Sequence, residues 1–228
     1  MYFYNLHLLL YLAPALILAA VAQWMVHSAY ARARQMGAGM SGFAAARRIL
    51  DSAELWQVGI EEVPGQLSDH YDPRVKILRL SSDVYHGRSL AAVGIAAHEA
   101  GHALQDAHRY PLLIVRNAAV PIANLGSGAG MFLLMMGLVA GILPLCYVGL
   151  VLFGGVVFFQ LVNLPVEFDA SARAKALLVD LGIVAPGDMP AVRSVLNAAA
   201  LTYVAATLQS VLTLMYYASR FTSRSERE

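Results

Sequence analysis

The chain has 228 residues, of which 58% are hydrophobic and only 14% are charged, a balance typical of a membrane protein. The net charge of +1 comes without a basic stripe, which argues against a nucleic-acid partner. Cys146 is the one cysteine, so an internal disulfide and a cysteine-rich zinc site are both excluded.

Apolar segments predict the membrane layout, since one span needs about 20 residues. Leu6–Val26 is the first, and we interpret it as an uncleaved anchor because no basic region precedes it, as a signal peptide would require. The uncharged run Asn117–Val166 is cut by Gly141 and Pro144, which predicts a hairpin of two spans. Ala198–Ala218 carries several polar residues, so it is read either as a fourth span or as a buried helix.

Two polar stretches, residues 31–116 and 167–197, flank the hairpin. Because two passes return the chain to its starting side, both stretches should lie on the same membrane face. They hold 13 of the 16 Lys and Arg residues. The positive-inside rule therefore predicts that they face the cytoplasm.

The first polar stretch predicts a small mixed unit of helices and strands. Ser41 and Ser89 can each cap a helix, the second running from Leu90 to about Ala107. Between them, Gln57–Val63 and Arg74–Leu80 have strand character.

The second of these helices carries the pattern His-Glu-x-x-His at residues 98–102. Residues four apart share a helix face, so His98 and His102 can present two imidazoles to one metal ion. Glu99 lies about 100° round the helix and can reach a metal-bound water without binding the metal. Zinc would lower the pKa of that water, Glu99 would take its proton, and the hydroxide would attack a polarised carbonyl. A helix that buried these residues only for packing would bury Glu99 at a cost.

Catalytic zinc usually has three protein ligands and one open position. By residue type the third ligand could be Glu167, Asp169, His70, His86 or His108. The first of these follows the uncharged run and should emerge on the face that also holds the motif helix. His70 lies in a turn-like segment, and His108 lies at the end of the helix and on another face.

Three stretches carry a family resemblance: residues 67–74 with 78–81, residues 98–105 around the motif, and residues 164–171. In this order they resemble the YugP-like family of bacterial membrane zinc metallopeptidases, over nearly the whole chain. The resemblance implies a neutral zinc endopeptidase in the bacterial cytoplasmic membrane, with one Zn²⁺ per chain and its site facing the cytoplasm.

A looser likeness links the chain to HtpX-like and CAAX-processing membrane proteases, which pair His-Glu-x-x-His with a downstream Glu-x-x-x-Asp. It implies that Glu167 is the third ligand. Ser171 stands where that pattern has Asp, the residue that usually orients a ligating histidine. Asp169, Asp106 or a backbone carbonyl would then have to take that role.

The oxyanion of an attacked peptide also needs a stabilising group. By residue type, the candidates are Tyr71, His70, Arg74, Tyr85 and His86. We further expect that strand Arg74–Leu80 could pair through its edge with an extended substrate.

Two other classes of function compete with this interpretation. A site-2-type intramembrane protease would place the motif inside an apolar span, whereas charged residues such as Arg88 and Asp106 flank it here. A non-catalytic zinc-binding membrane scaffold would use a closed site, typically rich in cysteine.

The sequence thus predicts a mainly α, polytopic membrane protein with a small zincin-like α+β catalytic unit on one membrane face. Its expected partners are a peptide or membrane-protein substrate and the lipid bilayer, and glycine-rich spans suggest a partner membrane protein or an oligomer. The expected parts are an N-terminal anchor (1–30), a catalytic unit (31–116), a transmembrane hairpin (117–166), a second part of the catalytic unit (167–197), and a fourth apolar helix with a polar tail (198–228).

Overall fold

The computed structural model describes residues 2–66 and 68–225. The chain divides into two compact units, each built from separate segments. The first, here called the helical unit, takes the residues up to Val21, Val115–Pro165 and the residues from Leu201. The second, here called the site unit, takes Ala22–Ile114 and Val166–Ala200. The last residues of the predicted polar tail, 226–228, lie outside the described part.

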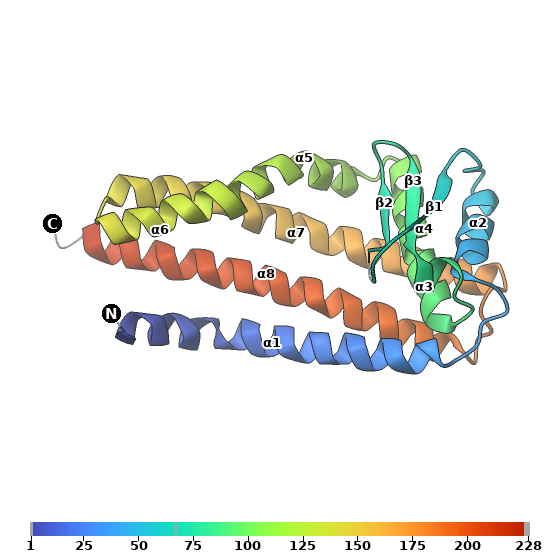
Figure 1. Cartoon of the computed structure of the whole chain (residues 1–228). Coiled ribbons are helices and arrows are strands. Elements are labelled where there is room, and N and C mark those ends of the chain that lie inside the picture. Colours follow the sequence, from blue (N-terminus) through green and yellow to red (C-terminus); the bar gives the residue numbers. More distant parts are fainter. Residues whose placement is uncertain (1, 67, 226–228) are drawn as a thin grey trace. The chain divides into compact units, whose positions relative to one another are not determined.

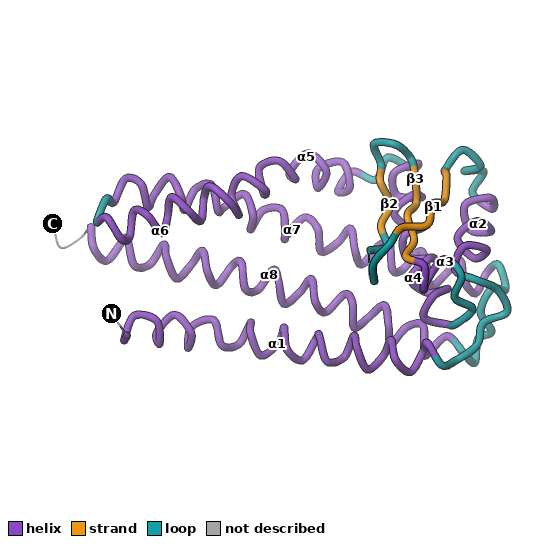
Figure 2. The backbone as a smooth tube through the Cα atoms, in the orientation of Figure 1, coloured by secondary structure: helices purple, strands orange, loops and turns teal. Residues whose placement is uncertain are grey.

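Long helices dominate the chain, as Figures 1 and 2 show. They are α1 (Tyr2–Arg34), α5 (Pro111–Leu125), a π-helical turn (Gly126–Gly130), α6 (Met131–Ala140), α7 (Leu143–Asp180) and α8 (Met189–Ser225). Within the described residues, four helical segments are long and apolar enough to cross a membrane: Leu6–Arg34, Pro111–Ala140, Leu143–Asp180 and Met189–Phe221. The mainly α, polytopic character predicted from the sequence is therefore confirmed, and the fourth apolar segment meets the same criteria as the others.

The predicted break in the long apolar run is present between α6 and α7. Gly141 ends α6 in the left-handed conformation, with φ 73°, and α7 begins at Leu143. Glycine adopts this conformation without steric cost, which explains the sharp helix end.

Glycines in the helical unit allow close packing within the chain itself. A Cβ at Gly126 would lie 2.2 Å from the carbonyl oxygen of Leu152 in α7, and one at Gly137 would lie 2.6 Å from Cys146 Sγ. These two glycines therefore serve packing between neighbouring helices of one chain. The partner or oligomer expected from the glycine content stays a prediction.

The site unit contains a three-stranded sheet and three shorter helices (Figure 2). The strands are β1 (Gly59–Val63), β2 (His70–Asp72) and β3 (Ile77–Ser81), and the helices are α2 (Gly42–Ser52), α3 (Ser82–Tyr85) and α4 (Leu90–Ala107). Ser41 and Ser89 cap α2 and α4 as predicted, each accepting a hydrogen bond from a backbone N–H three residues on.

The sheet has the order β1-β3-β2, with β3 parallel to β1 and antiparallel to β2. The prediction that Arg74–Leu80 offers a free edge to substrate is therefore wrong, because β3 is hydrogen-bonded on both sides. Residues 73–76 form the turn between β2 and β3, with Lys76 at a φ of 56°. The segment 70–72, which the sequence suggested to be turn-like, is an edge strand.

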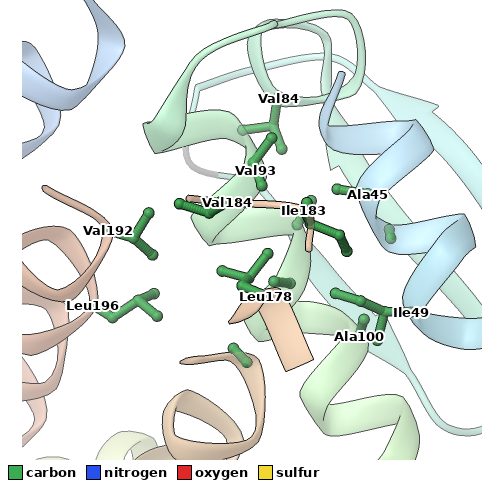
Figure 3. Close-up of a cluster of buried hydrophobic side chains, with 14 of the residues drawn as sticks. Ala45, Ile49, Val84, Val93, Ala100, Leu178, Ile183, Val184, Val192 and Leu196 are labelled. Carbon is green, nitrogen blue, oxygen red and sulfur yellow. The ribbon is translucent and has the colours of Figure 1, made fainter. Parts of the chain in front are cut away.

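Helix α4 lies in the core of the site unit. Its residues are buried on almost every face, in line with its nearly uniform apolar composition. Figure 3 shows Val93 and Ala100 of α4 among side chains from α2, α7 and α8, including Ile49, Leu178 and Val192. This packing holds the motif helix rigidly, and a catalytic or metal site built on rigid elements is held precisely.

Candidate metal site

Two histidines of α4 point at one carboxylate of α7. His98 Nε2 lies 3.2 Å from Glu167 Oε2, and His102 Nε2 lies 3.6 Å from the same oxygen. All three side chains are largely buried, with 14%, 9% and 8% of the side-chain surface exposed for His98, His102 and Glu167. Burial of two imidazoles and a carboxylate at one point is costly unless they bind one another or a cation.

The third member of this cluster reaches the histidines because α4 and α7 approach closely. A Cβ on Gly101 would lie 2.7 Å from the carbonyl oxygen of Ala170, three residues after Glu167. Glycine at 101 therefore lets the α4 backbone touch α7 within three residues of Glu167. Glu167 lies inside a continuous helix, so its direction is fixed by the helix and not by a loop.

The donor set and its spacing fit a zinc ion. One ligand atom from each of His98, His102 and Glu167 lies within 4.8 Å of the others, and these residues form the metal-type cluster found among the described residues. Zn–N and Zn–O bonds of about 2.0–2.2 Å in a tetrahedron place neighbouring ligand atoms about 3.4 Å apart. The observed separations of 3.2 and 3.6 Å bracket this value. Three protein ligands would leave the fourth position open, as catalytic zinc requires.

The other ring nitrogens of the two histidines also have partners. His98 Nδ1 lies 3.1 Å from Ser171 Oγ, and His102 Nδ1 lies 3.0 Å from Gln105 Oε1. The sequence suggested Asp169, Asp106 or a backbone carbonyl for this role, and that prediction is wrong for both ring nitrogens, whose partners are Ser171 and Gln105. The signal was available: Gln105 is three residues after His102 and Ser171 four after Glu167, and both spacings share a helix face.

Glu99 is oriented by the edge strand β2. Its Oε2 accepts a hydrogen bond of 3.1 Å from the backbone N–H of Tyr71. Burial raises the pKa of Glu99 to about 7, and the charge of Glu167 contributes, while His98 and the Tyr71 N–H lower it. A carboxyl group with a pKa near neutral pH can both take and return a proton there.

The Tyr71 side chain fastens β2 to α4. Its hydroxyl donates to Asp106 Oδ2 at 2.7 Å, and Lys76 Nζ pairs with the same carboxylate. Burial, and then this bond to Asp106, raises the pKa of Tyr71 well above its usual value, so the phenol stays protonated at neutral pH. Asp106 is thus engaged with Tyr71 and Lys76, whereas its neighbour in sequence, Gln105, contacts His102.

The remaining candidates from the sequence lie elsewhere in the site unit. Asp169 accepts from Gln105 Nε2 at 2.8 Å and from Arg173 Nε at 2.6 Å, so it reaches His102 through one intervening side chain. His70 is exposed, with Nδ1 2.8 Å from the carbonyl oxygen of Ser68. The side chain of Arg74 is likewise at the exposed turn after β2.

Two further histidines were considered as ligands. His86 pairs with Glu62 at 3.1 Å, and Nδ1 of His108 lies 3.3 Å from Arg173 Nη1, both in exposed positions. Neither belongs to the cluster of His98, His102 and Glu167.

Known proteins are similar to this chain over most of its length. A family model described as "Putative neutral zinc metallopeptidase" matches residues 8–222. The chain belongs to this zinc metallopeptidase family. A curated relative, "Putative membrane protease YugP" of Bacillus subtilis (strain 168), is 44% identical over 209 residues, which cover 91% of this chain and 93% of the relative. No solved structure matches the chain.

Membership of the zinc metallopeptidase family confirms the resemblance seen in the sequence and implies zinc as the metal. With its four apolar helices, the chain is a membrane member of this family. Helix α4, which carries the motif, is not one of the four candidate spans found among the described residues. The arrangement expected of a site-2-type intramembrane protease is therefore not favoured.

Proposed function

We propose that the chain is a membrane-embedded zinc endopeptidase in which His98, His102 and Glu167 hold one Zn²⁺ and Glu99 is the general base. The observation that carries the proposal is the convergence of both Nε2 atoms on one oxygen of Glu167, beside a carboxyl group with a pKa near 7. A bound zinc ion would supply Lewis acidity, polarising the scissile carbonyl and making a water ligand more acidic.

Side chains of the protein transfer the proton and orient the metal ligands. Glu99, fixed by the Tyr71 N–H, takes the proton from the attacking water at its carboxylate and later returns it to the leaving amine. Ser171 and Gln105 orient the two imidazoles. Close packing of α4 against α7 at Gly101 keeps the two histidines near Glu167.

The proposed site faces the cytoplasm. Support comes from charge: 13 of 16 Lys and Arg lie in the polar stretches 31–116 and 167–197, which the hairpin places on one side. With four spans, the two ends of the described part of the chain lie on the opposite side. Arg220 is then on the outer side, contrary to the positive-inside rule. The 13 Lys and Arg of the two polar stretches outnumber it and determine the orientation.

Zinc content and peptide cleavage, measured on the same detergent-purified samples, test this proposal. We expect about one zinc per chain and cleavage of a casein-type substrate in the wild type. Glu167→Ala should lose the metal and the activity. Glu99→Gln should keep the metal and lose about 10²- to 10⁴-fold in rate, the usual contribution of a general base.

Asp180→Ala provides the matched control, because it removes an exposed carboxylate from the same helix. It should retain zinc and activity. If Glu167→Ala kept both, the third ligand would lie elsewhere and the proposal would fail at that point. If the wild type bound zinc and Glu99→Gln changed no measured property, a non-catalytic zinc-binding scaffold would be the better interpretation.

A further inference from the structure

Gln105 is the most deeply buried polar side chain near the site, with 0% of its surface exposed. Its amide makes three contacts. Nε2 lies 2.8 Å from the carbonyl oxygen of Val166 and 2.8 Å from Asp169 Oδ2, and Oε1 lies 3.0 Å from His102 Nδ1. On α7, Val166 directly precedes Glu167 and Asp169 follows it by two residues. The Gln105 side chain of α4 therefore contacts α7 both before and after Glu167.

These contacts permit one orientation of the amide. A backbone carbonyl accepts hydrogen bonds and cannot donate. Asp169 is held as a carboxylate acceptor by Arg173, whose Nε donates to it at 2.6 Å. A flipped Gln105 would place its oxygen against two acceptors, whereas the observed orientation uses both N–H groups. Oε1 is thereby left facing His102.

An amide oxygen only accepts, so the nitrogen facing it must carry a proton. We infer that Gln105 is a positioning residue that fixes His102 in the Nδ1–H tautomer and thereby keeps its Nε2 lone pair directed at the metal position. The inference rests on the proposed function, because it assumes that His102 Nε2 is a metal ligand. The contacts of Gln105 with α7 thus determine which ring nitrogen of His102 carries the proton.

The partner of the other histidine imposes no such choice. Ser171 Oγ can donate to His98 Nδ1 or accept from it, since a hydroxyl group does both. Loss of the partner should therefore matter more at His102 than at His98. This difference separates tautomer control from a general need for a buried polar contact.

The first test is Gln105→Met, which keeps the approximate size of the side chain and removes the acceptor. Zinc affinity is measured by chelator competition, and the His102 tautomer by ¹⁵N NMR of histidine-labelled, metal-free protein. We expect about 10- to 100-fold weaker zinc binding, as for loss of other partners of metal ligands. At His102, a signal from the Nε2–H tautomer should appear in the variant and be absent from the wild type.

A charge-swapped pair keeps the test decisive if Gln105→Met folds poorly. Gln105→Glu alone places a carboxylate against Val166 and Asp169 and should weaken zinc binding. Adding Asp169→Asn restores an N–H donor opposite the new carboxylate and should recover much of the affinity. Gln57→Met, at an exposed position of the same unit, is the control and should bind zinc like the wild type.

The outcomes are distinguishable. If the wild type binds no zinc, the proposed function fails. If the wild type binds zinc and the folded Gln105→Met variant binds it within about twofold with an unchanged tautomer signal, the inference about Gln105 is wrong while the proposed function stands.

Discussion

Gly101 and Ala170 are in backbone contact: a Cβ at residue 101 would lie 2.7 Å from the carbonyl oxygen of residue 170. The obstructing atom belongs to the backbone of a long helix, so it cannot turn aside as a flexible side chain would. Gly101 directly precedes His102, and Ala170 is three residues after Glu167. It connects helix packing directly to the geometry of the candidate site.

Gly101→Ala should therefore weaken both the fold and the site. Alanine in a helix is normally about 1 kcal/mol more favourable than glycine, but overpacking here should reverse the sign and cost about 1–3 kcal/mol. Zinc affinity should fall as α4 and α7 separate. Thermal unfolding and chelator competition measure the two effects. Gly128→Ala is the control, since a Cβ there meets no atom within 4 Å; equal behaviour of the two variants would contradict the argument.

Ser171→Ala removes the hydroxyl that contacts His98 Nδ1 at 3.1 Å. We expect about 10-fold weaker zinc binding, because a ligating histidine loses the group that orients its ring. Ser171→Thr keeps a hydroxyl at the same position and should stay within about threefold of the wild type. Ser52→Ala is a control whose hydroxyl contacts only its own helix, at Ile49. Equal losses for the Ala and Thr variants at position 171 would show that packing, not the hydrogen bond, matters there.

Tyr71→Phe should separate metal binding from catalysis. The change removes the hydroxyl bond to Asp106 and loosens β2, whose backbone N–H holds Glu99. We expect kcat to fall about 10-fold, because a general base must be held within hydrogen-bond reach of its water, while zinc content stays at the wild-type level. Steady-state kinetics and metal analysis of the same sample check this. Loss of zinc would show that Tyr71 supports the ligands instead of the base.

Glu99 makes the stability of the metal-free protein depend on pH. Its pKa is about 7 in the folded protein against 4.5 ordinarily, so the folded state binds this proton more tightly than the unfolded chain does. The wild type should therefore lose stability as pH rises from about 4.5 to about 7 and then level off. In the presence of a chelator, Glu99→Gln should have a Tm a few °C above the wild type at pH 8, with a smaller difference at pH 5.

The exposed substitution Glu54→Gln is the control for this measurement and should show no such pH-dependent difference. If Glu99→Gln were less stable than the wild type at pH 8, the cost of burying the carboxylate would not be the controlling effect.

The sequence by itself determined the long elements and the catalytic motif. Apolar runs longer than a membrane span, the caps Ser41 and Ser89, and the break at Gly141 all rest on local chemistry, and each appears in the structure. His98 and His102 share a face because the helix period alone places residues four apart together. These features depend on neighbours in sequence, which is why they could be predicted.

Only the tertiary structure decided what meets across the chain. The sheet order leaves β3 without a free edge, and it makes residues 70–72 a strand whose amide holds Glu99. The approach of α4 to α7 brings Glu167 to both histidines and Gln105 to the backbone of Val166. The contacts between α4 and α7 join residues more than 60 positions apart, and the contact between Tyr71 and Glu99 joins residues 28 apart. A pattern confined to one helix carries no information about the surface that packs against it.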